Sequence, residues 1–260
     1  MVTAFGRIAL SLLQYFGELA LLVYETCRSM LVARIRWRLF ARQVVEVGWR
    51  SQLVVIVTGM FTGAVLTAQT YFQFSVLGMK SATGSVMAVA LFRELGPTLS
   101  GLMVAGRVGA AIAAEIGTMK VTEQIDALRS LAVHPIDYLV VPRVLAVVLS
   151  MPLLVAEAVG LGVFAGYLVG VHLLGISGPY FLNNLIRYVG PRDIKMMLCK
   201  AFCFGIVIAF VSCHQGLNAK EGAVGVGRAP TEAVVISSLV LLILNFFLTF
   251  LLNMLFPYGS

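Results

Sequence analysis

Long uncharged stretches alternate with short polar segments along the chain, and this pattern predicts a set of membrane-spanning helices. Four stretches contain no charged side chain: 51–79, 158–186, 201–219 and 233–260. A bilayer core needs about 20 consecutive apolar residues per helix. We therefore expect spans at about 51–71, 85–114, 144–172, 196–215 and 233–256. The predicted fold class is an all-α integral membrane protein with five transmembrane helices.

The N-terminal segment, residues 4–25, is apolar but carries a regular polar stripe. Its polar residues recur at offsets of 4, 3, 4 and 7 and are Arg7, Ser11, Gln14, Glu18 and Glu25. This spacing places them on one side of a helix. The segment has the length of a signal peptide or of a further span, but a glutamate within its apolar part is atypical of a cleaved signal. We interpret it as an amphipathic helix lying in the membrane interface, with a true span as the alternative.

Composition supports a membrane protein and suggests its orientation. Hydrophobic residues make up 60% of the 260 residues and charged residues 12%, against about 25% charged in an ordinary soluble domain. The net charge is +7, and seven arginines precede the first long span: Arg7, Arg28, Arg34, Arg36, Arg38, Arg42 and Arg50. The positive-inside rule then places the N-terminus in the cytoplasm. A basic flank beside a span is typical of contact with anionic lipid, so we expect no nucleic-acid partner.

The span count also bears on assembly. We expect residues 1–48 to form a cytoplasmic interfacial helix and basic connector, and residues 49–260 to form a five-span domain. Many secondary transporters place their pathway between two repeats of one chain, but this sequence shows no internal repeat. A five-span unit without repeats is expected to find its second half in another copy, as a two-fold homodimer.

The sequence lacks the residue patterns that metal binding, ATP binding and intramembrane catalysis require. The cysteines and histidines show no metal-ligand spacing, so we expect no metal site. The phosphate-binding pattern G-x-x-x-x-G-K-[ST] does not occur, and the chain therefore has no usual means of binding ATP. An intramembrane enzyme would need a nucleophile with a base or a metal triad, and no such constellation is present. A separate ATPase subunit must therefore supply the energy for transport.

The second predicted span contains charges that an apolar helix tolerates only when they are paired or hydrated. Arg93 and Glu94 lie within it, and Pro97 frees a backbone carbonyl nearby. Glu94 and Glu115 are 21 residues apart, or about 31 Å along a helix, which matches a hydrocarbon core. With Glu115 at the cytoplasmic edge, the charged pair lies near the outer face. Two readings stay open: a structural ion pair and a contact for substrate.

Two further patterns concern packing and docking. Small residues recur at every fourth position in Gly101, Ala105, Gly109 and Ala113, and in Gly162, Gly166 and Gly170, which predicts close approach of neighbouring helices. Segment 117–132 reads as a short surface helix that ends at His134 and Pro135. Its apolar ridge is Val121, Ile125, Leu128 and Ala132, and its charged residues are Lys120, Glu123, Asp126 and Arg129. It is either a solvated connection or a docking helix for a cytoplasmic partner.

These motifs resemble one known family. The chain contains RELGP at 93–97, AGRVGAAIAAEIGTMKVTEQIDAL at 105–128, a V-H-P turn at 133–135, QLVVIVTGMFTGAVLTAQ at 52–69 and GVGRAPTEAVV at 225–235. Together they resemble the MlaE/YrbE family, the permeases of bacterial ABC transporters that work with MCE proteins. The resemblance covers about residues 40–255.

The resemblance implies a homodimeric, non-catalytic permease in the inner membrane of a Gram-negative bacterium. Implied partners are a cytoplasmic ABC ATPase that binds ATP and Mg, a periplasmic MCE-domain protein, and a small cytoplasmic STAS-domain subunit. The implied substrate is phospholipid, whose transport maintains outer-membrane asymmetry. The implied lipid path is bordered by Arg93, Glu94, Arg42, Arg228 and Tyr71. The segment implied to contact the ATPase is 117–132, and the residues implied to couple to it are Glu115, Lys120, Glu123, Asp126, Leu128 and Arg129.

Some residues depart from the family pattern, namely Lys80 in a short outer loop, Glu157 in the third span and Glu232 before the fifth. They leave open a related permease of another MCE system, for another lipid or a sterol. A different class also stays open: an ion-coupled carrier in which Arg93, Glu94, Glu157 and His172 form a proton relay. Transport on an ion gradient without an ATPase would distinguish it.

Overall fold

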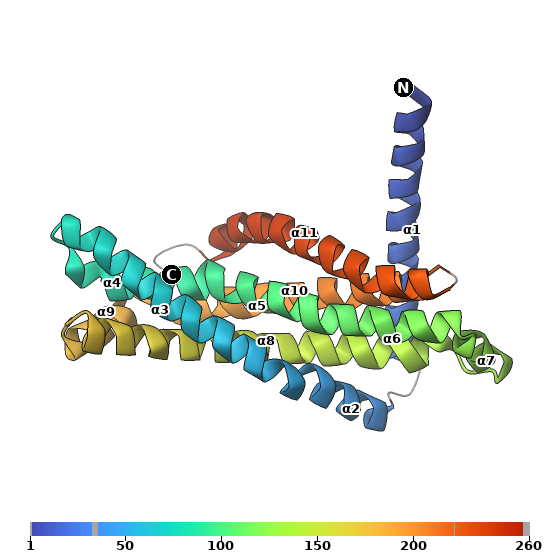
Figure 1. Cartoon of the computed structure of the whole chain (residues 1–260), viewed down its shortest axis with the longest axis horizontal. Coiled ribbons are helices and arrows are strands. Elements are labelled where there is room, and N and C mark those ends of the chain that lie inside the picture. Colours follow the sequence, from blue (N-terminus) through green and yellow to red (C-terminus); the bar gives the residue numbers. More distant parts are fainter. Residues whose placement is uncertain (1, 33–35, 221, 257–260) are drawn as a thin grey trace.

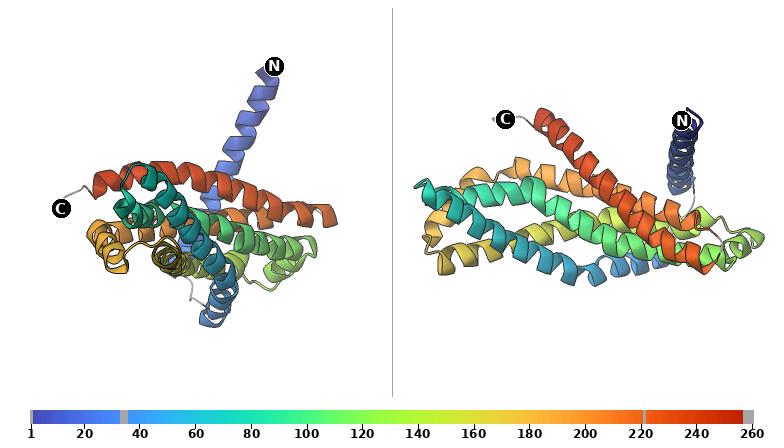
Figure 2. Two further views of the ribbon diagram at one scale, coloured as in Figure 1. Left: turned by 60° about the vertical axis from the view of Figure 1, so that its left-hand side comes forward. Right: turned by 45° about the horizontal axis from the view of Figure 1, so that its top comes forward.

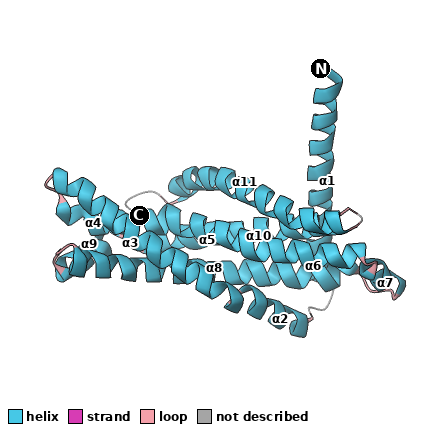
Figure 3. Cartoon of the chain, viewed as in Figure 1, coloured by secondary structure: helices cyan, strands magenta, loops and turns pink. Residues whose placement is uncertain are grey.

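The computed structural model describes residues 2–32, 36–220 and 222–256, and its regular elements in these ranges are all helical (Figure 3). The α-helices are α1 (Val2–Val32), α2 (Trp37–Val47), α3 (Gln52–Val76), α4 (Thr83–Ala90), α5 (Gly96–Val104), α6 (Ala110–Val121), α7 (Gln124–Ser130), α8 (Val141–Leu168), α9 (Gly178–Tyr188), α10 (Pro191–Leu217) and α11 (Ala223–Leu255). Arg34, part of the basic N-terminal cluster, lies outside the described residues.

Five helical stretches of the described chain are long and apolar enough to cross a membrane, which confirms the predicted number of spans. They are Trp37–Val76, Thr83–Val121, Ile136–Leu173, Pro191–Leu217 and Val224–Leu255. The long helices run side by side, with α7 at one end of the bundle and α4 and α9 at the other (Figure 1). The helix α11 crosses its neighbours obliquely (Figure 2).

The second span is not a uniform α-helix. Single π-helical turns at Leu91–Leu95 and Ala105–Gly109 join α4 to α5 and α5 to α6. Turns of this kind are uncommon and are frequent at functional sites. The first contains Arg93 and Glu94 and the second contains Arg107, so the charges of this span lie where the helix geometry changes.

The predicted rows of small residues do bring helices together. Gly59 and Gly63 of α3 lie against the backbone of Ala158 and Gly162 of α8, so closely that a Cβ atom at Gly63 would overlap the Gly162 carbonyl group. The row in the second span packs against α10, where Gly109 faces Ser212. Both contacts use the absence of a side chain to let backbones approach, as membrane helices commonly do.

The N-terminal helix α1 projects from the bundle at a steep angle to the long helices (Figures 1 and 2). It is not among the five stretches suited to crossing a membrane. Its C-terminal half meets the α7 end of the bundle, where Leu22 is buried and Ser29 donates a hydrogen bond to Asp137. An interfacial position for α1 stays a prediction.

Two segments expected to be loops are helical. The region after the third span contains α9, an amphipathic helix that begins at the sequence Gly178-Pro179 and buries Phe181. Proline suits the first turn of a helix because its missing N–H has no intrahelical acceptor there, so Pro179 starts a helix where a loop was expected. The connection between the fourth and fifth predicted spans, residues 216–232, is also shorter than expected, because α11 begins at Ala223 and continues through Pro230.

The helix expected over 117–132 is divided. The first part belongs to α6, which ends at Val121, and α7 then covers only Gln124–Ser130. Glu123 before α7 (φ 58°) and Ala132 after it (φ 56°) are the non-glycine residues of the described chain with positive φ. This left-handed conformation costs an L-residue about 1–2 kcal/mol, so α7 is set off from the bundle by two strained joints.

One prediction follows for the second joint. Ala132→Gly should raise the free energy of unfolding by about 1 kcal/mol, because glycine adopts the left-handed conformation without a Cβ penalty. Equilibrium unfolding in mixed micelles would measure it. The control Ala127→Gly lies inside α7 and should lower stability by about 1 kcal/mol. A loss of stability in Ala132→Gly equal to that of the control would contradict a strained joint.

Candidate functional site

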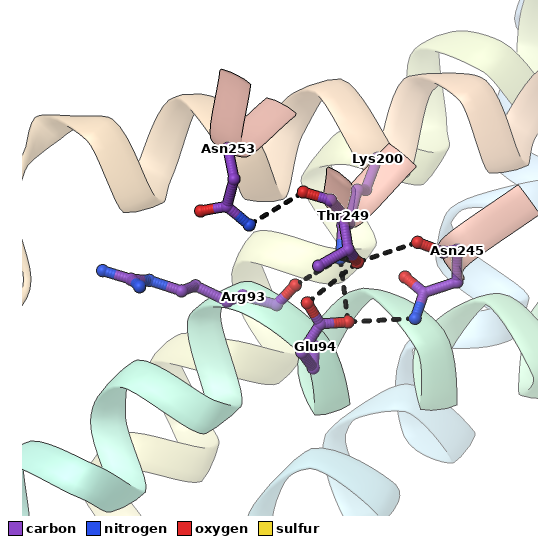
Figure 4. A network of polar contacts seen from close by, with 6 residues as sticks. All are labelled: Arg93, Glu94, Lys200, Asn245, Thr249 and Asn253. Carbon is purple, nitrogen blue, oxygen red and sulfur yellow. Dashed lines mark hydrogen bonds and ion pairs between the residues drawn. The ribbon is translucent and has the colours of Figure 1, made fainter. Parts of the chain in front are cut away.

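A buried lysine is the centre of a polar network near the α4 and α9 end of the bundle (Figure 4). Lys200 of α10 is 0% exposed. Its Nζ donates to the Arg93 carbonyl oxygen at 2.8 Å, to Glu94 Oε2 at 2.9 Å and to Thr249 Oγ1 at 2.8 Å. An ammonium group has three N–H donors, so all three are satisfied although the side chain is fully buried.

The local sequence of the second span explains why the Arg93 carbonyl can serve Lys200. A regular α-helix would use it as the acceptor for the N–H of Pro97, four residues on, but proline has no N–H. The π-helical turn also changes the backbone hydrogen-bond pattern here, since the Gly96 N–H donates to the carbonyl of Leu91, five residues back. The carbonyl is therefore free to accept a hydrogen bond from another helix.

Glu94 joins three helices of the network. Besides Lys200, it accepts hydrogen bonds from Asn245 Nδ2 at 2.9 Å and Thr249 Oγ1 at 3.0 Å, both on α11. Its side chain is 38% exposed, whereas that of Lys200 is 0% exposed. The carboxylate thus faces a more open region on one side and its ion-pair partner on the other.

Arg93 points to a different partner. Its Nε forms an ion pair with Asp193 Oδ1 at 2.5 Å, and Asp193 also accepts a hydrogen bond from the Gly190 N–H at the start of α10. Asp193 is 2% exposed. Two cations and two carboxylates therefore meet around Arg93 and Lys200, and their formal charges cancel.

The sequence placed Arg93 and Glu94 in a costly environment that requires pairing, and both are paired. They do not pair with each other, however, because their partners lie on α10 and α11, about one hundred or more positions away. Sequence reasoning did not select Lys200, Asp193, Asn245 or Thr249. A usable signal existed in the polar residues at every fourth position of the last span, Asn245, Thr249 and Asn253, which share one helix face.

The other residues expected along a lipid path are not part of this network. Tyr71 lies near the end of α3, where its ring is 5.5 Å from Lys80 Nζ. Arg42 on α2 and Arg228 in the first turns of α11 are exposed and lie toward the α7 end. The structure therefore separates these residues into two groups at opposite ends of the spans.

The residues expected to couple to an ATPase gather around α7. Glu115 pairs with Arg143 at 2.9 Å, Asp126 with Arg129 at 3.0 Å and with Lys120 at 3.8 Å, and Glu123 forms the first left-handed joint. The middle of the apolar ridge expected to enter a partner faces inward instead, since Ile125 is 1% exposed and Leu128 packs partly against the core, whereas Ala132 is exposed. The surface open to a partner is charged and includes the exposed Leu131.

The proposed proton relay does not assemble within the described residues. Arg93 and Glu94 are held by the network of α10 and α11. Glu157 on α8 and His172, in the π-helical turn Val169–Leu173, form no hydrogen bond or ion pair with either. A relay needs successive groups within hydrogen-bond reach, so this geometry gives the ion-coupled alternative no support.

Comparison with known proteins gives a consistent picture. Residues 40–251 match the family model described as Permease MlaE. A probable ABC transporter permease protein of Rickettsia felis is 44% identical over 244 residues, covering 94% of each chain. A probable ABC transporter permease protein of Synechocystis is 42% identical, covering 86% of this chain and 85% of the relative. The chloroplastic protein TRIGALACTOSYLDIACYLGLYCEROL 1 of Arabidopsis thaliana is 38% identical, covering 85% and 63% respectively.

Proposed function

The chain belongs to the MlaE permease family, and from this premise we propose that it is the phospholipid-moving membrane subunit of an ATP-driven transporter. In this proposal it forms a homodimer and binds a cytoplasmic ABC ATPase, with a small STAS-domain protein as a further cytoplasmic subunit. It exchanges lipid with a periplasmic MCE protein and so maintains outer-membrane asymmetry. The observation that carries the proposal is the polar network around Lys200, which lies at the end of the spans opposite α7.

The distribution of basic residues supports an orientation with the α7 end in the cytoplasm. Basic residues of this end are Arg36, Arg38, Arg42, Arg50, Lys120, Arg129, Arg143, Lys220 and Arg228. Those of the other end are Lys80, Arg187, Arg192 and Lys195. The positive-inside rule assigns the richer end to the cytoplasm. The network around Lys200 then lies toward the outer face of an inner membrane, where an MCE protein would receive or deliver lipid.

The network suits a polar headgroup at this position. Intramembrane charges are costly and mark substrate pathways or structural pairs, and Glu94 is both paired and partly exposed. Its open side offers acceptor oxygens in an otherwise apolar setting. One relative carries the name of a glycolipid, which supports a lipid as the class of substrate.

The last span supports a two-fold assembly around a lipid-sized space. Only 17% of the most apolar window of α11 is buried, against 72% for the third span. Its exposed side chains include Phe246, Phe247 and Phe250. We propose that this face of α11 meets substrate and the second copy of the chain.

Reconstitution tests the proposal. Proteoliposomes that contain this chain, its ATPase and its MCE partner should transfer fluorescent phospholipid to acceptor vesicles only when ATP is hydrolysed. Omitting the ATPase should abolish transfer. Transport driven by an ion gradient in the absence of the ATPase would instead favour the carrier reading.

A variant of α7 tests whether this helix couples ATP hydrolysis to lipid transfer. Asp126→Arg should lower ATP-driven lipid transfer at least tenfold, because the exposed Asp126 would change from attracting to repelling Arg129 and the charges facing the ATPase. Transfer in the proteoliposomes described above and co-purification with the ATPase are the two measurements. The control is Glu25→Arg, which reverses the charge of an exposed side chain on α1, outside α7, and should retain the ATPase. Unchanged transfer in Asp126→Arg would remove α7 from the coupling route.

A further inference from the structure

A polar cavity lies at the α7 end of the bundle, well away from the network around Lys200. It has a volume of about 620 Å³ and is lined by α2, α6, α8 and the helical turns Trp49–Ser51, Ala105–Gly109 and Ile136–Val140. Its charged lining residues are Arg42, Arg50, Arg107, Arg143, Glu46 and Glu115. A cavity of this volume is large enough for a small ligand or a lipid headgroup.

The charges of this cavity do not cancel. Its two glutamates pair with Arg50 at 2.7 Å and with Arg143 at 2.9 Å. Arg42 and Arg107 have no carboxylate partner within the described part of the chain. Four arginines against two glutamates leave a formal charge of +2 on the lining, so the cavity favours an anion.

Arg107 holds N–H donors that no acceptor in the described part of the chain satisfies. Arg107 is half-buried in its π-helical turn and donates from Nη1 to Ser51 Oγ at 2.6 Å. Ser51 fixes this group but cannot neutralise it. Arg143 is 4% exposed and donates to Glu115 and to the Leu139 carbonyl oxygen. Its Nε has no acceptor among the described residues but is closed off from solvent, so Arg143 adds positive charge to the wall and offers this donor to no ligand. An oxyanion presents several acceptors to arginine at once, so it would satisfy the remaining donors of Arg107.

The depth of the cavity indicates where such an anion comes from. Arg107 precedes Glu115 by eight positions, or about 12 Å along the helix, so the cavity extends from the membrane edge into the headgroup and upper acyl region. Trp37 at the start of α2 and Trp49 just after its end are 69% and 72% exposed. Tryptophan is enriched at the membrane–water interface, which places the wall formed by α2 among lipid headgroups.

We infer that this cavity binds the phosphate group of a glycerophospholipid from the cytoplasmic leaflet, with Arg107 as its principal ligand and Arg42 at its rim. The inference rests on the proposed function only for the orientation of the chain. Glu94 and Arg107 are 13 positions apart, or about 20 Å along the span. One headgroup cannot contact both, so the cavity is a site separate from the network around Lys200.

Binding of short-chain lipids to the purified full-length protein tests the inference. Native mass spectrometry with dioctanoyl-phosphatidylglycerol, and with dioctanoylglycerol as the phosphate-free probe, would measure it. Phosphatidylglycerol should bind about tenfold more tightly than dioctanoylglycerol. Arg107→Gln should remove most of that difference, because charge-assisted hydrogen bonds are the strong ones, whereas Arg107→Lys should keep binding within about threefold of the unchanged protein.

The control removes an equal charge from the other end of the bundle. Arg187→Gln on α9 should leave phosphatidylglycerol binding unchanged. The thermal unfolding midpoint of Arg107→Gln should stay near that of the unchanged protein, because Arg107 is half-buried and Ser51 keeps its hydrogen bond to the Val47 carbonyl oxygen. Equal phosphatidylglycerol binding by Arg107→Gln would overturn the inference. So would Arg107-dependent binding of inorganic phosphate without any binding of the lipid, since the source would then be a soluble anion.

The outcome is independent of the transport proposal. The binding measurement needs neither ATP nor partner proteins. A chain that binds phosphatidylglycerol through Arg107 but transfers no lipid when reconstituted would retain this site and refute the proposed function. Transfer that persists without Arg107-dependent binding would refute the site alone.

Discussion

Glu94→Ala is expected to lower the free energy of unfolding by about 3 kcal/mol, because it leaves the ammonium of Lys200 buried without a counter-ion. Lys200 is 0% exposed and keeps only two neutral acceptors in this variant, the Arg93 carbonyl and Thr249. The opposite change, Lys200→Met, should cost less. Glu94 is partly exposed and retains hydrogen bonds from Asn245 and Thr249. Equilibrium unfolding in mixed micelles measures both losses.

The double variant Glu94→Gln with Lys200→Met separates structure from transport. Removing both members of a buried ion pair is often nearly neutral for stability, so this protein should unfold within about 1 kcal/mol of the unchanged chain. If the network contacts lipid, ATP-driven transfer should still fall at least tenfold. Full transfer by the stable double variant would assign the pair a purely structural role. Equal losses of stability in Glu94→Ala and Lys200→Met would contradict the difference in burial between the two side chains.

Gly63→Ala is expected to cost about 3 kcal/mol of stability, the upper part of the usual range for overpacking. A Cβ atom at this position meets the backbone of Gly162, which cannot rotate aside as a flexible side chain could. The helices α3 and α8 would have to separate along their contact. Thermal unfolding of the purified protein would show the loss as a lowered midpoint.

The matched control for Gly63→Ala is Gly160→Ala on α8. No atom of the described residues lies within 4 Å of a Cβ atom built at Gly160, and alanine has the higher helix propensity. This variant should leave stability unchanged or raise it slightly. A comparable loss in both variants would mean that glycine acts through helix flexibility and not through the close approach of two backbones.

Hydropathy was sufficient to predict the number of spans, because the bilayer imposes a length and forbids unpaired backbone groups. The interfacial position of α1 stays a prediction. Hydropathy was weaker for the connections between spans, since Pro179 lies in the first turn of α9 and Pro230 lies inside α11. The break at Glu123 could not be anticipated, because a left-handed glutamate has no sequence signature of its own.

The site was predicted in part for a similar reason. The cost of burying charge identified Arg93 and Glu94 and required partners for them. It could not say which helix supplies those partners, since Lys200 and Asp193 meet them only through tertiary packing. The exposure of Ile125 was misjudged because periodicity defines a face of a helix and not what covers that face.

The π-helical turn that carries Arg93 and Glu94 has a consequence for how this sequence tolerates insertion and deletion. A π turn is one residue longer than the α turn that it replaces, and each residue of an α-helix rotates the chain by about 100°. Deleting Leu95 should convert Leu91–Leu95 to regular helix and turn Glu94 away from Lys200 by about that angle relative to the rest of the span. Among homologues, a one-residue gap at this point should therefore coincide with loss of the lysine in α10, even though about a hundred positions separate them.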